Sequence, residues 1–124
     1  MSKITGFIGT YTKGESEGIY SFTLDTDNAK MMDIKLAAKA ENPTYVAVSK
    51  SAPELYAVVK KGAQGGLAAY SIKEDGGLSL SSIQLTDGTS PCHVSIDSKN
   101  TFAAAAYYHR GTVELYTSEE GNLK

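Results

Sequence analysis

The sequence predicts an all-β protein, namely part of a β-propeller built from four-stranded antiparallel blades. Residues 42–49 (NPTYVAVS) are echoed 48 residues later by residues 90–97 (SPCHVSID). Each copy is followed by an apolar run, a gap that contains glycine and a segment that alternates between polar and apolar residues. A repeat of about 45 to 50 residues with several short strands in each unit is typical of propellers, in which one repeat forms one blade.

The first unit, residues 4–40, contains three expected strands. Residues 4–12 and 19–25 are rich in β-branched and aromatic residues, and a polar, glycine-containing gap separates them. The turn sequence Asp-Thr-Asp-Asn ends the second of these segments, and residues 32–40 form a third, weaker strand. In comparison with the next unit, this one lacks its first strand.

The second and third units follow the same order. The second unit, residues 43–86, has four expected strands, at residues 44–49, 54–60, 67–73 and 78–85. The third unit, residues 91–124, repeats three of them, at residues 93–97, 101–108 and 112–117, and the chain ends near the start of a fourth. Four alanines at 103–106 favour a helix by propensity alone, but they occupy second-strand positions, so we predict a strand there.

The number of units points to a larger closed structure. At about 47 residues per unit the chain supplies roughly 2.6 blades, whereas propellers use about four to eight. A closed propeller must pair or cover its sheet edges, so the missing first strand of the opening blade is expected from the C-terminus of a longer chain. We therefore expect residues 1–124 to be the N-terminal part of a single propeller domain of about seven blades.

Composition excludes several classes of protein. The chain has 124 residues, 41% of them hydrophobic. Its net charge is −2, and its lysines and single arginine are scattered, so the composition does not predict a nucleic-acid partner. No apolar run approaches the roughly 20 residues of a membrane span. Cys92 is the single cysteine, and with two histidines at unrelated spacing it predicts neither a disulfide nor a metal site. We expect a cytoplasmic protein with no membrane partner and no cofactor.

The segment Gly-Glu-Ser-Glu-Gly at residues 14–18 matches the G-x-S-x-G pattern of a hydrolase nucleophile elbow. That elbow needs a helix after the serine, whereas strands are expected on both sides here. The two glutamates beside Ser16 would also disfavour a developing oxyanion. We predict a polar hairpin loop.

The candidate site residues gather at one end of the blades. In a meander, the start of each first strand lies at the same end as the finish of each second strand, and first strands line the central channel. This places His93 near the channel mouth, although a packed histidine that hydrogen-bonds a neighbouring blade is the alternative. The candidates for binding a ligand at the same end are Tyr11, Tyr107, Tyr108, His109 and Arg110.

Several segments together resemble the opening of the seven-bladed β-propeller lactonases. They are GTYTKG at 9–14, EGIY at 17–20, NPTYVAVS at 42–49, SPCHVSID at 90–97 and AYY at 106–108. The match runs over the whole chain, and the Gly-His and Trp-Asp markers of WD-type blades are missing. Where members of this family tend to read Ala-Asn-Tyr, this chain has Ala106-Tyr107-Tyr108.

The resemblance implies a lactone hydrolase that opens the δ-lactone of 6-phosphogluconate in the pentose phosphate pathway without a metal. The substrate would be a small phosphorylated sugar lactone. The Pro-Cys-His-Val stretch carries over from the family pattern, and it makes His93 the candidate catalytic residue. The family's charged residues lie beyond the equivalent of Lys124, so the chain needs the remaining blades of the same propeller and should be inactive alone.

Two other functions fit the same fold. One is a non-catalytic propeller module that binds a protein or a sugar on its top face, since fold alone does not determine function. The other is a cycloisomerase-like enzyme that acts on a lactone-forming diacid. A converging set of charged residues in the later blades would distinguish an enzyme from a binding module.

Overall fold

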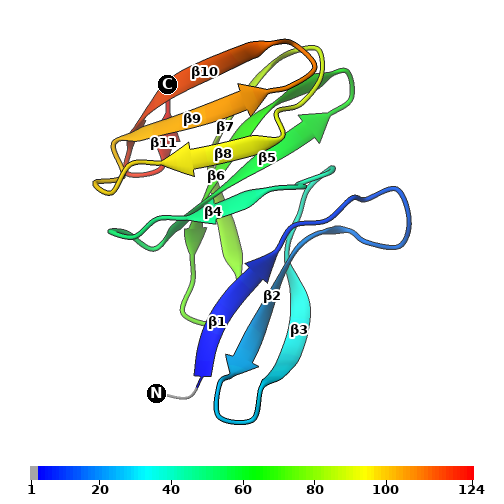
Figure 1. Ribbon diagram of the computed structural model, residues 1–124, viewed down its shortest axis with the longest axis vertical. Coiled ribbons are helices and arrows are strands. Elements are labelled where there is room, and N and C mark those ends of the chain that lie inside the picture. The colour runs from blue at the N-terminus through cyan, green and yellow to red at the C-terminus, as the bar shows by residue number, and fades with distance from the viewer. Residues whose placement is uncertain (1–2) are drawn as a thin grey trace.

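A computed structural model describes residues 3–124 as three antiparallel sheets (Figure 1). The first sheet has the order β1 (Lys3–Ile8), β2 (Gly18–Asp25), β3 (Lys30–Lys39). The second has the order β4 (Val46–Val48), β5 (Glu54–Lys61), β6 (Gln64–Ile72), β7 (Leu78–Asp87). The third has the order β8 (His93–Ile96), β9 (Phe102–Tyr107), β10 (Thr112–Glu119), β11 (Asn122–Leu123). No helix in these residues could cross a membrane.

Each sheet is a meander whose strands pair in sequence order, as in a propeller blade, so the predicted fold class is confirmed. The repeat seen in the sequence is kept in the pairing register. Val46 on β4 pairs with Ala57 on β5, and Val94 on β8 pairs with Ala105 on β9, so both members of the second pair lie 48 positions after those of the first. The alanine run is a strand, as predicted.

The second sheet is buried on both faces because β5 alternates between two cores. Leu55, Ala57 and Val59 pack against the first sheet, while Tyr56 and Val58 pack against the third. All five side chains are at most 3% exposed. Burying a large apolar side chain is worth roughly 1.5–3 kcal/mol, so sheet-to-sheet contact is the main source of stability in this stack.

The structure shortens some predicted strands. Residues 9–12 were expected to continue the first strand, but β1 ends at Ile8. Gly9 lies so close to the next link between strands that a Cβ on it would overlap the Pro43 carbonyl oxygen. A residue with a side chain would not fit at this close approach of two backbone segments.

The third sheet has a fourth strand, the two-residue β11. The sequence predicted that the chain ends near the start of this strand. It pairs with the end of β10 through Ser118 and Leu123. The two turn residues, Glu120 and Gly121, have φ values of 53° and 85°. Two-residue hairpin turns of this kind are usually signalled by Asn-Gly or Asp-Gly, so Glu-Gly gave a weak signal.

The two outer faces of the stack are apolar and open to solvent. On the third sheet, Phe102, Val113 and Leu115 are 46%, 72% and 67% exposed. On the first sheet, Ile4 and Met31 are 54% and 51% exposed. Contiguous apolar faces of this kind are typical of surfaces that another sheet covers.

Expressed alone, the 124-residue chain should therefore self-associate or aggregate. Light scattering after size-exclusion chromatography measures this, and Leu115→Lys should shift the population toward smaller species because it places a charge on one open face. Lys50→Gln, which lies on neither open face, is the control. A monodisperse wild-type monomer with a cooperative melt would contradict the interpretation that these are blades of an incomplete propeller.

Candidate functional site

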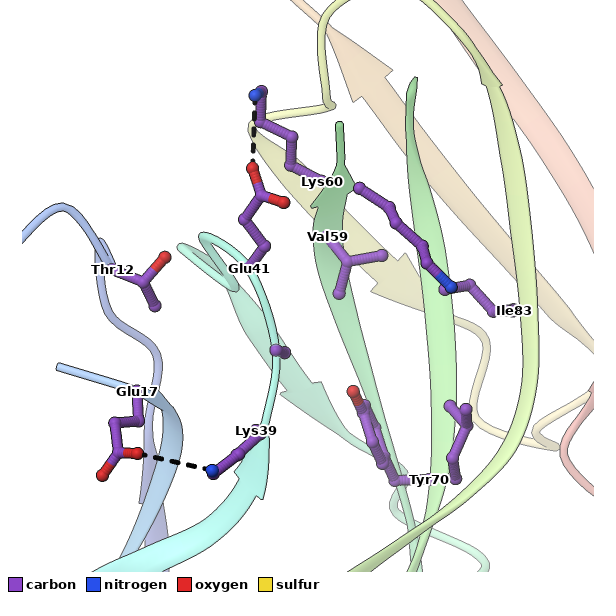
Figure 2. A pocket seen from close by; sticks show the side chains of 11 residues that line it. Thr12, Glu17, Lys39, Glu41, Val59, Lys60, Tyr70 and Ile83 are labelled. Carbon is purple, nitrogen blue, oxygen red and sulfur yellow. Dashed lines mark hydrogen bonds and ion pairs between the residues drawn. The ribbon is translucent and has the colours of Figure 1, made fainter. Parts of the chain in front are cut away.

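Several hollows lie between neighbouring sheets, and two of them are of interest for function. One, of about 580 Å³, separates the first and second sheets, and Figure 2 shows the side chains that line it. The other, of about 250 Å³, is a groove between β4 and β8. These two strands are the first strands of their sheets, and first strands surround the central channel of a propeller. The groove is therefore the part of the described chain that faces the channel.

His93 lies at the start of β8 and lines this groove. Its neighbour Val94 is 1% exposed and anchors the strand, while the imidazole itself is exposed. The ring contacts Tyr45 of the preceding sheet, with 4.4 Å between ring centroids. No hydrogen bond to the imidazole occurs within residues 3–124, so both ring nitrogens remain open to a ligand. Packing against Tyr45 fixes the ring without using its nitrogens.

Tyr107 is buried and Arg110 is partly buried. Tyr107 is 1% exposed, and its hydroxyl is 3.5 Å from that of Tyr116. The Arg110 guanidinium stacks 4.2 Å above the Tyr107 ring, donates a 2.7 Å hydrogen bond to Thr86 Oγ1, and lies 3.9 Å from the Glu114 carboxylate. Arg110 thus ties the β9–β10 turn to the end of β7. Its contacts are those of a structural residue.

Burial raises the pKa of Tyr107, and the pKa of Tyr116 is raised by burial and by its hydrogen bond to Glu114. Both hydroxyls therefore keep their protons at neutral pH. They act as hydrogen-bond donors within the interior and cannot serve as bases.

The other predicted binding residues are at the surface. Tyr108 is 80% exposed, and its ring meets His109 edge to face at 5.2 Å in the β9–β10 turn. This turn is at the same end as His93, which pairs with Ala106 on β9. Tyr11, which is 68% exposed, lies in the loop between β1 and β2. Tyr108, His109 and Tyr11 are therefore free to contact a ligand.

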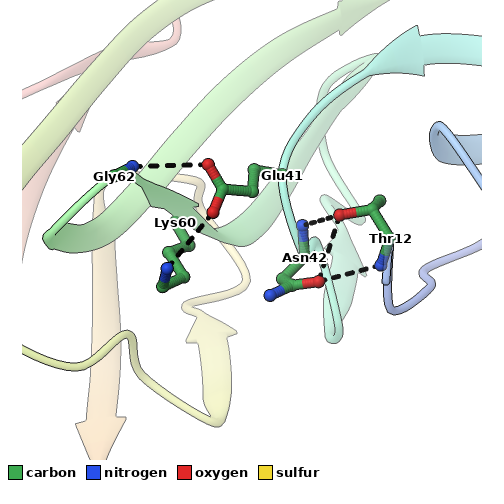
Figure 3. A network of polar contacts seen from close by, with 5 residues as sticks. All are labelled: Thr12, Glu41, Asn42, Lys60 and Gly62. Carbon is green, nitrogen blue, oxygen red and sulfur yellow. Dashed lines mark hydrogen bonds and ion pairs between the residues drawn. The ribbon is translucent and has the colours of Figure 1, made fainter. Parts of the chain in front are cut away.

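A polar network that the sequence did not predict joins three connections between strands (Figure 3). Thr12 donates from its backbone nitrogen to Asn42 Oδ1 at 2.8 Å, and the Asn42 backbone nitrogen donates to Thr12 Oγ1 at 3.1 Å. Glu41 accepts from Lys60 Nζ at 3.2 Å and from the Gly62 backbone nitrogen at 3.3 Å. These bonds join the β1–β2 loop, the β3–β4 link and the β5–β6 hairpin.

The network has two local signatures. Asn42 has a φ of 45°, a left-handed conformation that asparagine adopts more readily than most residues. The hydrogen bond from the Gly62 backbone and the one from Lys60 lower the pKa of Glu41. The only sequence signal was the Asn-Pro pair, whose repeat position is occupied by Ser90-Pro91.

Ser16 lies in the loop between β1 and β2, and a strand follows it rather than a helix. Its Oγ donates to Thr10 Oγ1 at 2.6 Å, and Thr10 in turn donates to the Gly18 carbonyl oxygen at 2.6 Å. The serine therefore closes the loop internally. The geometry is that of the predicted hairpin loop.

Asp97 closes the turn between β8 and β9 at the other end of the groove. Its carboxylate accepts hydrogen bonds from the Thr101 hydroxyl and from the backbone nitrogens of Thr101 and Phe102, the latter two at 2.7 and 2.8 Å. The hydrogen bond from the Thr101 hydroxyl, and after it the one from the Phe102 backbone nitrogen, lowers the pKa of Asp97. Within residues 3–124, no three His, Cys, Asp or Glu side chains gather as metal ligands.

Three stacked meanders around a channel-facing groove define a β-propeller protein. Residues 5–124 match the family of lactonases with a seven-bladed β-propeller. The chain therefore belongs to this lactonase family.

Individual relatives agree with this assignment. The chain is 52% identical over 126 residues to the 6-phosphogluconolactonase of Bacillus subtilis. The match covers 100% of this chain and 36% of that protein. A crystal structure of a protein from Lactobacillus plantarum matches with a TM-score of 0.92 and 35% identity, over 98% of this chain and 36% of that one. The periplasmic gluconolactonase of Pseudomonas aeruginosa, at 24% identity and a TM-score of 0.88, shares the fold. The chain thus spans about a third of its relatives' length.

Asp97→Asn should destabilise the chain at neutral pH but not in acid. A carboxylate whose pKa is depressed by folding contributes stability above its ordinary pKa of 3.8, and that contribution is lost as the pH falls through the lowered value. Urea unfolding at a series of pH values should show a gap between wild type and variant that closes below pH 3.8. Lys99→Gln in the same turn is the control, and a gap that is independent of pH would contradict the assignment.

Ser16→Ala should remove one hydrogen bond and nothing else. We expect a loss of about 1 kcal/mol in the free energy of unfolding. In a full-length propeller that carries this loop, lactone hydrolysis should stay within about twofold of wild type. A thousandfold loss of turnover would instead identify Ser16 as a nucleophile.

Proposed function

We propose that the propeller to which this chain belongs is a 6-phosphogluconolactonase, which hydrolyses 6-phosphogluconolactone to 6-phosphogluconate in the pentose phosphate pathway. The observation that carries the proposal is the 52% identity, over the whole chain, to the Bacillus subtilis protein of that name. The exposed imidazole of His93 on the channel-facing groove supports it.

Hydrolysis of a lactone needs a base that activates water and a donor that stabilises the oxyanion of the tetrahedral intermediate. His93 can supply either, because its ring nitrogens are free and its orientation is held by Tyr45. A neutral imidazole accepts the proton of the attacking water through one nitrogen. The other nitrogen carries a proton that it can donate to the carbonyl oxygen.

The substrate would bind at the rim beside His93. Tyr108 and His109 are exposed at that end of the third sheet, Tyr11 is exposed in the β1–β2 loop, and the three would offer hydroxyl and ring contacts to the sugar. Tyr107 and Arg110 would act indirectly, because their stacking holds the turn that carries Tyr108 and His109. Cations for the phosphate would come from the remaining blades of the propeller, without a metal or other cofactor. A cytoplasmic location fits a substrate whose phosphate charge prevents passage through a membrane.

A chimaera tests the proposed function directly. This chain would replace the matching segment of the Bacillus subtilis enzyme, whose later blades would complete the channel. The expected result is a folded propeller that hydrolyses 6-phosphogluconolactone, measured by the release of acid. A chimaera that melts cooperatively, as the parent does, but lacks activity would contradict the proposal.

In this chimaera, His93→Ala should lower kcat by about a hundredfold or more while the melting temperature moves little, since the side chain is exposed. Ser95→Ala is the matched control, because Ser95 is an exposed residue of the same strand and the same groove. A loss of several degrees in melting temperature with turnover intact would show that His93 is a packing residue.

A further inference from the structure

The cleft between the first and second sheets is separate from the channel-facing groove and has the size of a small-molecule site. Its volume of about 580 Å³ falls within the roughly 300–1,000 Å³ that is usual for ligand pockets. Val59, Tyr70, Leu80 and Ile83 form an apolar wall on the second sheet (Figure 2). The proposed function makes no use of this cleft.

Strand register explains why the apolar wall is open. Ile83 on β7 pairs with Ala68 on β6, and directly paired residues point to the same face of a sheet. Ala68 belongs to the core shared with the first sheet, so Ile83 faces that sheet as well. Nevertheless Leu80 and Ile83 remain 56% and 40% exposed. From β3 and the residue that follows it, the first sheet offers small side chains to this core, namely Ala37, Ala38 and Ala40.

Tyr70 brings an unused hydrogen-bond donor into the cleft. Its side chain is 5% exposed, and its hydroxyl has no hydrogen-bond partner within residues 3–124. In Figure 2 the Tyr70 oxygen lies at the end of the ring nearer to Val59, inside the cleft. The ring is buried, but the hydroxyl itself reaches the open space of the cleft, where a ligand can take its hydrogen bond. Burial also raises the pKa of Tyr70, so the hydroxyl keeps the proton that it can donate.

The equivalent tyrosine of the next sheet shows the contrast. Tyr70 pairs with Leu55, and Tyr116 pairs with Ala103, which lies 48 positions after Leu55. Tyr116 donates a 2.7 Å hydrogen bond to Glu114, whereas Tyr70 has no such acceptor. A tyrosine at this repeat position therefore does not require an open hydroxyl. The open hydroxyl is specific to the tyrosine in the cleft.

The rim of the cleft carries an excess of one positive charge. Lys39 is 3.7 Å from Glu17, and Lys60 is 3.2 Å from Glu41, so these four side chains compensate one another. Lys61 also lines the cleft and has no acidic partner in the part of the chain that the structure describes. An anionic group at this rim would meet an unpaired cation.

We propose that this cleft binds a small aromatic acid. The flat apolar body would lie on Val59, Leu80 and Ile83, an acceptor atom on the ring would take the hydrogen bond from Tyr70, and the acidic group would lie near Lys61. A sugar phosphate, which is polar throughout, does not match the apolar wall. The site is therefore distinct from the one proposed for the lactone. If the cleft binds no such acid, the proposed function is unaffected.

The probe is 6-hydroxy-2-naphthoate, a fluorescent acid with a ring hydroxyl at one end and a carboxylate at the other. Titration into the chimaera described above, which contains this chain in a complete propeller, should give a saturable fluorescence change with one site per molecule. Two analogues separate the contributions. Removal of the ring hydroxyl, in 2-naphthoate, and removal of the charge, in 2-naphthol, should each weaken binding at least fivefold.

Variants locate the site. Tyr70→Phe keeps the ring and removes the donor. It should weaken the binding of 6-hydroxy-2-naphthoate at least fivefold and leave the binding of 2-naphthoate unchanged. Ile83→Glu, at a half-exposed position, should abolish binding by placing an anion on the apolar wall. Tyr116→Phe and Lys99→Gln are matched controls elsewhere in the chain, and both should bind as wild type.

Two results would overturn the proposal. One is the absence of saturable binding to the chimaera that carries no further substitution. The other is binding that survives both Tyr70→Phe and Ile83→Glu, which would place the probe elsewhere on the propeller. Circular dichroism of each variant confirms that its sheets are intact, and Ile83→Glu remains informative if Tyr70→Phe perturbs the fold.

Discussion

The structure depends on one constraint: a blade has two apolar faces and can bury them only against its neighbours. β5 shows this most clearly, because Leu55 and Ala57 pack toward one sheet while Tyr56 and Val58 pack toward the other. The second sheet has a neighbour on both sides and is the best buried of the three. The outer sheets each have one neighbour, and their free faces carry exposed apolar residues such as Leu115. Stability in this architecture is therefore a property of contacts between blades.

Polar groups between the blades add directional hydrogen bonds to this apolar packing. Tyr56 lies in the core shared by the second and third sheets, and its hydroxyl is 3.0 Å from Asn100 Oδ1 and 2.5 Å from Ser118 Oγ. Glu54 accepts hydrogen bonds from Tyr56 and Asn100, so its buried carboxylate is satisfied. Breaking one member would leave the others buried without partners, which costs more than the bond itself contributes. Such a network fixes how one blade is set against the next.

The sequence predicted the blade order and the strand register well, because the 48-residue repeat is kept in the strand pairing. Val46 and Val94 occupy equivalent positions, and each pairs with an alanine on the second strand of its own sheet. The sequence predicted the ends of strands less well. Gly9 ends a strand through a contact with Pro43, which is distant in sequence, and no local signal reports that contact. The repeat register predicted His93 on the channel side and Tyr107 at the same end. Tyr107 comes one position after Ala106, the residue paired with His93, and it lies in the core because alternate residues of β9 face the second sheet.

Both proposed sites lie where equivalent positions of the repeat differ. The blades share the same strand pairing, so such a difference lies in the side chains and their neighbours and not in the pairing of the backbone. At the start of the inner strand, Tyr45 in one blade becomes His93 in the next, and an imidazole replaces a phenol in the groove between β4 and β8. At the third strand, Tyr70 and Tyr116 are the same residue in the same register, but only Tyr116 has an acceptor built beside it. A repeat protein can thus acquire separate sites by changing one side chain, or one neighbour of a side chain, while blade packing holds the frame constant.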